Sequence, residues 1–286
     1  MSWSHQRSPA PQPSADRTPI ADQLVRGSLG KPAIHDKWES KYRTRTNERF
    51  YELVFDELAR LVPRHRTTTT FLDAGCGIGA HSSRLARRGF IVEAVDFSDV
   101  VIERARANVA SQGLKARISV HQADLLELPF EAETFDHALC WGVLMHVPDV
   151  SAALSQLARV TRPGGAIVIN EINARAPEAR LLRMLFPHMR NREIQIKRTP
   201  AGFEHWETTP TGPLMWRHAD INWLVREASR CGLILRRRMP GQFSELYTKM
   251  PARWLADGVH AVNRIWFERV RMPGPAVANV LVFEKR

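Results

Sequence analysis

The first clear periodic pattern of apolar side chains lies between residues 35 and 61. Apolar residues recur there at spacings of three and four, which is the spacing of one face of an α-helix. The pattern predicts one or two amphipathic helices, which Pro63 ends. Residues 1–33 show no such pattern and are rich in proline, glycine and polar residues, so we expect a disordered N-terminal tail. A single domain is expected over residues 34–286.

Short β-branched runs alternate with helical patterns between residues 69 and 171. The predicted strands are 69–74, 91–96, 118–122, 135–141 and 166–171. The predicted helices between them are 80–88, 98–112 and 150–160. This alternation is typical of an α/β fold, in which helices cover a parallel sheet.

Residues 174–218 interrupt the alternation. A connection of this length is long for a compact domain, so we expect a lid over a substrate site, with an inert surface insertion as the alternative. His205 and Trp206 in this segment are predicted to contact the substrate under this lid, since imidazole and indole rings suit a polar, ring-bearing molecule. The remaining predicted elements are a helix at 220–231, a strand at 233–238, a helix at 252–270 and a strand at 276–284.

The chemistry of the chain is concentrated where the first predicted strand ends, in the sequence DAGCGIG at 73–79. Its alternate glycines, Gly75, Gly77 and Gly79, let the backbone turn tightly and approach a ligand without obstruction from Cβ atoms. The helix that follows presents free backbone amides to the same ligand. The segment is therefore typical of a nucleotide-binding loop, and since a G-x-G-x-x-G/A pattern also occurs in dinucleotide-binding proteins, other residues must decide the ligand.

Three carboxylates lie at or just after the ends of predicted strands near this loop. Asp73 precedes Gly75 by two residues, where it would repel a pyrophosphate and attract a ligand ammonium. Asp96 ends the second strand, from which an acidic side chain can accept hydrogen bonds from ribose hydroxyls. Asp124 can accept a hydrogen bond from the exocyclic amine of adenine, while Leu125 packs on the ring. An adenosine that carries an amino-acid tail fits all of these positions.

In these segments the sequence resembles the class I S-adenosylmethionine-dependent methyltransferases. The resemblance covers residues 71–173 and rests on DAGCGIG, VDFS, ADLLELPF, FDHALCWGVLMHVPD and RPGGAIVI, in that order. It implies a doubly wound, Rossmann-like sheet of seven strands in the order 3-2-1-4-5-7-6, with the seventh strand antiparallel, and S-adenosyl-L-methionine as the cofactor. A helical insertion at 251–271 departs from the usual short hairpin between the last two strands.

The resemblance also implies which residues surround the cofactor. Phe97 in the second motif belongs to this site, and Cys140 and Trp141 at the end of the fourth strand would border the transferable methyl group, with core packing as the alternative for Trp141. The run after this strand lacks the Asn or Asp, Pro, Pro, aromatic pattern of the enzymes that methylate amino groups of nucleic acids. The aspartates of metal-dependent catechol enzymes are also missing, so we expect no metal.

His146 stands where small-molecule methyltransferases of this kind often have a histidine. Its ordinary pKa near 6.5 suits removal of an acceptor proton, so it is predicted to be the catalytic base, with a structural role in the following turn as the alternative. Glu171 and Asn173 are expected to contact the acceptor, because ligands of such sheets bind outside the carboxyl ends of the strands.

The composition is that of an ordinary globular protein, with 44% hydrophobic and 25% charged residues, which excludes a fibrous or wholly disordered chain. No apolar stretch approaches the roughly 20 residues that span a bilayer. The N-terminus lacks the apolar core of a signal peptide, so a cytoplasmic location is expected. Three cysteines are too few for a disulfide framework.

The formal net charge of +11 is concentrated in residues 172–286, which hold 20 Lys and Arg against 10 Asp and Glu. This asymmetry indicates either a solvated arginine-rich surface or an acidic partner. We expect methyl transfer to a small molecule, at a hydroxyl oxygen, in secondary-metabolite, glycan or quinone-type biosynthesis. The alternatives are an RNA or protein methyltransferase that uses the basic C-terminal part, and a noncatalytic cofactor-binding subunit. The 251–271 helix is expected to pack on the domain, with dimerisation or contact with an anionic membrane surface as alternatives.

Overall fold

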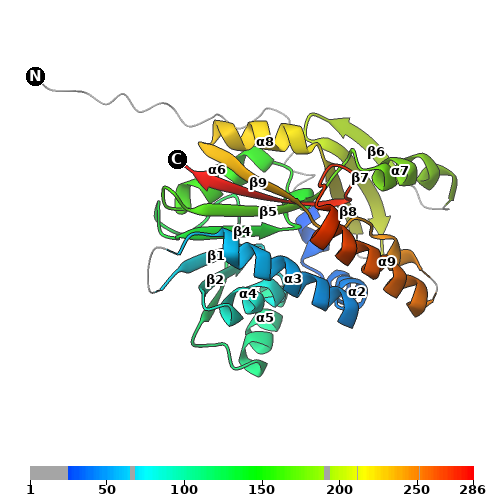
Figure 1. The fold of residues 1–286 in the computed structure, drawn as a ribbon. Helices are drawn as coiled ribbons and strands as arrows, with labels where there is room; N and C mark the ends of the chain where they lie inside the picture. Colours follow the sequence, from blue (N-terminus) through cyan, green and yellow to red (C-terminus); the bar gives the residue numbers. More distant parts are fainter. Residues whose placement is uncertain (1–24, 65–67, 190–193, 211, 251) are drawn as a thin grey trace, which may run out of the picture.

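The computed structural model describes residues 25–286 except 65–67, 190–193, 211 and 251. At its centre is a seven-stranded sheet in the order β3-β2-β1-β4-β5-β10-β9 (Figure 1). Its strands are β1 (Thr70–Ala74), β2 (Ile91–Asp96), β3 (Ile118–Gln122), β4 (His137–Trp141), β5 (Ala166–Ile172), β9 (Leu233–Pro240) and β10 (Ala278–Lys285). Strands β1 to β5 pair in parallel, and β10 is antiparallel to both of its neighbours. The predicted order is confirmed, with β9 and β10 as the sixth and seventh strands.

Helices cover both faces of this sheet, which explains why its strands carry apolar side chains on both faces. On one face lie α6 (Val150–Val160) and α8 (Ile221–Arg230), and on the other lie α3 (Arg45–Leu61), α4 (Ala80–Arg87) and α5 (Asp99–Ser111). Consecutive residues of β1 point to opposite faces, so Leu72 packs in the first core and Phe71 in the second.

The segment predicted as a lid is built from regular structure. It contains α7 (Pro177–Met189) and a three-stranded antiparallel sheet of β6 (Ile194–Thr199), β7 (Gly202–Thr209) and β8 (Gly212–Ala219). Strand β8 contacts the short helix η1 (Leu144–His146), which follows β4. A bridge between Asn173 and Ala219 joins β8 to the chain just after β5. The small sheet therefore lies at the carboxyl ends of β4 and β5.

The N-terminal part differs from the expected disordered tail. Residues 25–29 are helical and α2 spans Pro32–Tyr42. Val25 and Leu29 are buried in one cluster with Leu214 and Met215 of β8. The prediction of disorder is therefore wrong for residues 25–33, because this apolar pair, four residues apart, finds its partners on a strand far along the chain. Residues 1–24 lie outside the described residues.

A helix between the last two strands was predicted and is present as α9 (Arg253–Ile265), which continues as a π-helical turn, η3 (Trp266–Val270). The buried Phe267 ring packs against Phe50 of α3, at 5.7 Å between ring centroids. This contact fixes the end of the insertion to the domain. None of the helices in the described part of the chain is long and apolar enough to cross a membrane.

The arginine run at 236–238 lies on β9, an edge strand of the large sheet. The Arg236 guanidinium forms an ion pair with Glu284 at 2.7 Å, and Arg238 Nε donates to Asn279 Oδ1 at 2.7 Å. Charged side chains on an edge strand oppose pairing with a strand of another molecule. Two of the three arginines thus have partners on β10, and the run has a structural explanation.

Candidate active site

The glycine loop connects β1 to α4 through backbone conformations that favour glycine. Gly75, Gly77 and Gly79 have φ angles of 78°, 54° and 77°. The amides of Gly75 and Cys76 both donate to the carbonyl oxygen of Val95, at 2.8 and 2.9 Å. A Cβ atom at Gly75 would overlap the side chain of Val143. The loop can therefore turn sharply at the ends of β1 and β2 only with glycine in this place.

Asp96 ties the end of β2 to this loop. Its Oδ2 atom accepts from the Gly77 amide at 3.0 Å, and its Oδ1 atom accepts from the Ser98 amide at 3.1 Å. Burial raises the pKa of this carboxyl, while these backbone donors oppose the shift. A carboxylate held in this way presents its remaining lone pairs in a defined direction.

The loop forms one wall of a cavity of about 290 Å³. The cofactor residues expected from sequence that line it are Gly75, Gly77, Asp96, Phe97, Asp124, Leu125 and Trp141. Three expected residues, Asp73, Gly79 and Cys140, are not part of its wall. Gly79 caps α4, and Cys140 is fully buried inside β4. The cavity thus lies at the carboxyl ends of β1, β2 and β4 and beside the chain that follows β3, as expected for a ligand site in such a sheet.

Asp73 lies behind the glycine loop. Its Oδ2 atom accepts from the Ser82 hydroxyl at 2.5 Å, and the side chain is 1% exposed. Burial raises the pKa of Asp73 to about 6, against the opposing hydrogen bond from Ser82. Asp73 thus connects β1 to the first turn of α4 and does not itself line the cavity. Its contact with a ligand ammonium stays a prediction.

The N-terminal helices also line this cavity, which sequence analysis missed. Arg26 forms an ion pair with Asp124 at 2.8 Å, and its guanidinium lies 5.7 Å from the centre of the Phe97 ring. Leu29 and Trp38 also line the cavity. These residues lie far from the glycine loop in sequence, and only the apolar spacing around residue 38 could have drawn attention to them.

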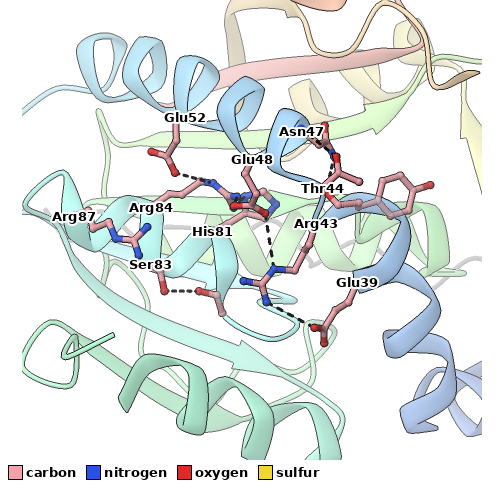
Figure 2. A network of polar contacts seen from close by, with 12 residues as sticks. Glu39, Arg43, Thr44, Asn47, Glu48, Glu52, His81, Ser83, Arg84 and Arg87 are labelled. Carbon is pink, nitrogen blue, oxygen red and sulfur yellow. Dashed lines mark hydrogen bonds and ion pairs between the residues drawn. The ribbon is translucent and has the colours of Figure 1, made fainter. Parts of the chain in front are cut away.

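An ion-pair network holds α3 against α4 beside this cavity. Figure 2 shows the Arg84 side chain of α4 lying among residues of α3, where it pairs with Glu48 and, at 3.3 Å, with Glu52. Arg84 is 2% exposed and lies 5.0 Å from the centre of the Tyr51 ring. Burial and the Arg84 charge lower the pKa of His81 well below its ordinary value. The network thereby keeps Tyr51 and a neutral His81 at the cavity wall.

A second, larger cavity of about 770 Å³ adjoins the first. Both cavities are lined by the same group of mainly aromatic residues, which are Trp38, Tyr42, Tyr51, His81, Trp141, Gly142 and His146. The larger cavity alone adds four carboxyl groups, those of Glu171, Glu178, Glu207 and Glu245. Two ligands, one bound in each cavity, would therefore lie next to each other at the residues that both cavities share, most of which carry aromatic rings.

His146 lies on the shared wall and is held in one orientation. Its Nδ1 atom is 2.7 Å from the Met215 carbonyl oxygen, which can only accept, so Nδ1 carries the proton and Nε2 keeps its lone pair. The Trp38 indole stacks on the imidazole. Burial, with the charge of Arg217, lowers the pKa of His146 to about 4 against the effect of the Met215 carbonyl, so the ring is neutral at neutral pH.

Glu171 lines the larger cavity, as expected, and is 1% exposed. Neither of its carboxyl oxygens has a hydrogen-bond partner of regular geometry among the described residues. Burial raises the pKa of Glu171 to about 8, although Arg217 and the backbone of Met145 and Leu144 act in the opposite direction. A buried polar group of this kind requires an explanation.

The other expected acceptor residues lie outside the wall of the larger cavity. Asn173 donates to the carbonyl oxygen of Gly274 at 2.8 Å and so fixes the turn before β10. His205 is buried, with its ring stacked on Trp216 at 5.3 Å between centroids. Trp206 packs at the N-terminal apolar cluster. Other residues of the 174–218 segment do line the cavity, among them Glu178, Glu207 and, on β8, Trp216 and His218.

The residues present fit S-adenosylmethionine. The smaller cavity offers a glycine loop that a Cβ atom would obstruct, the Asp96 carboxyl at the end of β2, and Asp124 beside the apolar Phe97 and Leu125. These donors, acceptors and apolar surfaces match an amino-acid tail, a ribose and an adenine ring. Among the described residues there is no cluster of His, Cys, Asp and Glu that could hold a metal ion.

Comparisons with known proteins agree with this description. Residues 72–169 match the family model of the methyltransferase domain. Methyltransferase GfsG of Streptomyces halstedii is 38% identical over 105 residues, which cover 36% of this chain and 38% of that protein. The ubiquinone biosynthesis O-methyltransferase of Hahella chejuensis is 33% identical over 157 residues, which cover 53% of this chain and 62% of that protein. The matched region therefore spans only part of these relatives.

The fold is also that of solved methyltransferase structures. The CcbJ methyltransferase from Streptomyces caelestis superposes with a TM-score of 0.57 at 16% sequence identity, covering 85% of this chain and 97% of that chain. At this identity the likeness concerns the fold alone. The family match and the strand order agree: residues 72–169 match a methyltransferase domain, and the seven-stranded sheet has the Rossmann-like fold of the class I S-adenosylmethionine-dependent methyltransferases.

Proposed function

We propose that this chain transfers the methyl group of S-adenosylmethionine to a hydroxyl oxygen of a small, ring-bearing acceptor. The observation that carries the proposal is the shared wall of the two cavities, which includes Trp141 and His146. A cofactor in the smaller cavity and an acceptor in the larger one would be brought together in a site lined by rings. Such positioning is the main requirement of a displacement reaction.

The cofactor residues follow from the walls of the smaller cavity. The backbone at Gly75 and Gly77 would hold the amino-acid part, Asp96 the ribose, and Asp124 with Leu125 the adenine. When bound, S-adenosylmethionine supplies a methyl group activated by its attachment to a sulfonium. The aromatic side chains of Trp141 and Tyr51 line both cavities and would exclude water from their junction when both ligands are bound.

His146 is the proposed base. Its neutral ring has Nδ1 engaged with the Met215 carbonyl, so Nε2 is the atom that would accept the proton from the acceptor hydroxyl as the oxygen is methylated. Arg217, which is bound to the carbonyl oxygens of Leu144 and Val147, holds the η1 turn that carries His146. The proposed O-methylation also agrees with the name of the ubiquinone biosynthesis relative.

The test is a product screen with the purified protein. S-adenosylmethionine is supplied with pools of hydroxylated aromatic compounds, glycosides and quinols, and mass spectrometry detects products heavier by one methylene, together with S-adenosylhomocysteine. A methyl ether formed by the wild-type protein and lost in His146→Ala supports the proposal. Methylation confined to RNA or protein, or cofactor binding without turnover on any pool or cell extract, would overturn it.

A further inference from the structure

Two buried side chains in the described part of the chain, those of Glu171 and His205, lack a hydrogen-bond partner of regular geometry on every polar atom, and of these two Glu171 lines the larger cavity. Buried polar groups elsewhere have partners: Asn263, for example, donates to the Ser244 carbonyl oxygen at 2.9 Å and accepts from the Ser244 amide at 2.9 Å. Both oxygens of Glu171, by contrast, have no partner of regular geometry in the described part of the chain, although the side chain is 1% exposed. Burying an unpartnered polar group destabilises a fold, so its retention in a cavity points to a ligand.

The surroundings of Glu171 show which ligand group is missing. The charge of Arg217 acts on it, but this guanidinium donates to the Glu204 carboxylate at 2.8 Å and to two carbonyl oxygens of the η1 region. The backbone of Met145 and Leu144 also favours the charged form of Glu171, although neither carboxyl oxygen has a hydrogen-bond partner of regular geometry. Since no ion pair to Glu171 occurs among the described residues, a ligand in the cavity that Glu171 lines can supply the partner.

We propose that Glu171 binds a second hydrogen-bond donor of the acceptor, so that the preferred acceptor carries two hydroxyl groups on or beside its ring. This inference rests on the proposed function, in which the other hydroxyl faces His146. Both residues line the larger cavity, and the η1 helix that carries His146 packs against β5, which carries Glu171. One acceptor can therefore reach both side chains, one through the hydroxyl that is methylated and the other through the hydroxyl that orients it.

The test compares a minimal pair of ring compounds, catechol and phenol, with the protein loaded with S-adenosylhomocysteine. Calorimetry should show that the wild-type protein binds catechol about tenfold more tightly than phenol, as expected for one additional buried hydrogen bond. Glu171→Leu should abolish this preference, and Glu171→Gln, which keeps a side-chain acceptor, should retain most of it. Glu103→Gln, at an exposed carboxyl of α5 outside both cavity walls, is the control and should leave the preference unchanged.

A second readout separates a binding role from a structural one. If the Glu171 carboxyl serves only an acceptor, Glu171→Leu should raise the Tm of the ligand-free protein by about 2–4 °C, because the cavity wall loses an unpartnered polar group. A lower Tm together with an unchanged catechol preference would overturn the inference. Equal affinity of the wild-type protein for catechol and phenol would also overturn it. Neither result would affect the proposed function, whose failure appears as absence of methylated products in the separate screen.

Discussion

The indole ring of Trp38 stacks on the imidazole ring of His146, with 5.2 Å between centroids and 27° between the ring planes. Trp38 lies on α2, at the N-terminal side of the glycine loop in sequence, whereas His146 follows β4. The N-terminal helices therefore contribute directly to the orientation of the proposed base. The methyltransferase region matched by the family model begins only at residue 72 and does not include this contribution.

Trp38→Ala should lower kcat about tenfold, because the imidazole loses the face that restricts its orientation. Trp38→Phe retains an aromatic face and should retain most of the turnover. Steady-state kinetics with the acceptor found in the product screen measures both. Unchanged kcat in Trp38→Ala would show that the Met215 carbonyl alone orients the ring.

His146→Ala should lower turnover by about two orders of magnitude, the usual effect of losing a general base, with little change in the affinity for S-adenosylmethionine. Single-turnover kinetics and calorimetry give the two quantities. His205→Phe is the matched control, because it removes a buried histidine outside both cavity walls and should keep its turnover. A parallel loss of unfolding free energy and turnover in His146→Ala would favour a structural role for this residue.

Arg26→Ala should weaken the binding of S-adenosylmethionine about two- to fivefold. The ion pair with Asp124 is partly exposed, so it contributes modestly to the closure of the N-terminal segment over the cavity. Calorimetry at low and high salt measures the effect, and the difference between wild type and variant should shrink as salt screens the pair. Arg106→Ala breaks an exposed ion pair with Glu103 that lies outside the cavity wall and should leave the affinity unchanged. Tighter binding by Arg26→Ala would show instead that Arg26 competes with the adenine amine for Asp124.

The pH dependence of stability should reflect the buried histidines. Burial and Arg183 lower the pKa of His205 to about 4, whereas the unfolded chain has the ordinary value near 6.5. Between these values the unfolded state binds the proton and the folded state does not, so the stabilisation is present above pH 6.5 and is lost as the pH falls toward 4. Denaturant unfolding should therefore show wild type losing on the order of 2 kcal/mol relative to His205→Phe between pH 7 and pH 4.5. Parallel stability curves for the two proteins would contradict the depressed pKa.

Buried carboxyl groups with raised pKa values have the opposite effect on the pH dependence of stability: they favour the folded state at low pH. Burial raises the pKa of Glu171 to about 8 and, together with Glu178, that of Glu245 to about 7. Their contribution to the free energy of unfolding is fully present below the pKa near 4 that they have in the unfolded chain, and it is lost as the pH rises through the raised pKa values of the folded state. The comparison with His205→Phe isolates the histidine, because both proteins keep the same carboxyl groups.

Local chemistry in the sequence was enough to predict the large sheet and the glycine loop. Strand β2 and helix α6 occur over the predicted residues 91–96 and 150–160. The periods of two and 3.6 residues are properties of single elements, and the positive φ angles of Gly75 and Gly77 follow from the turn itself. The strand order was implied by the resemblance to the class I methyltransferases, because rules of α/β connection reduce the possible orders without selecting one.

The acceptor side of the site depended on contacts between distant segments. His205 and Trp206 had suitable chemistry, but the His205 ring packs against Trp216, its partner across the β7–β8 pair, and against His218, and these two residues line the cavity in its place. The single proton position of His146 depends on a carbonyl 69 residues away, at Met215. The burial of Val25 and Leu29 likewise depends on β8. Periodicity identifies which face of an element is apolar, but it does not identify the element that packs on that face. The shape of a cavity between two elements, and the protonation of the side chains that line it, are therefore decided only when the chain folds.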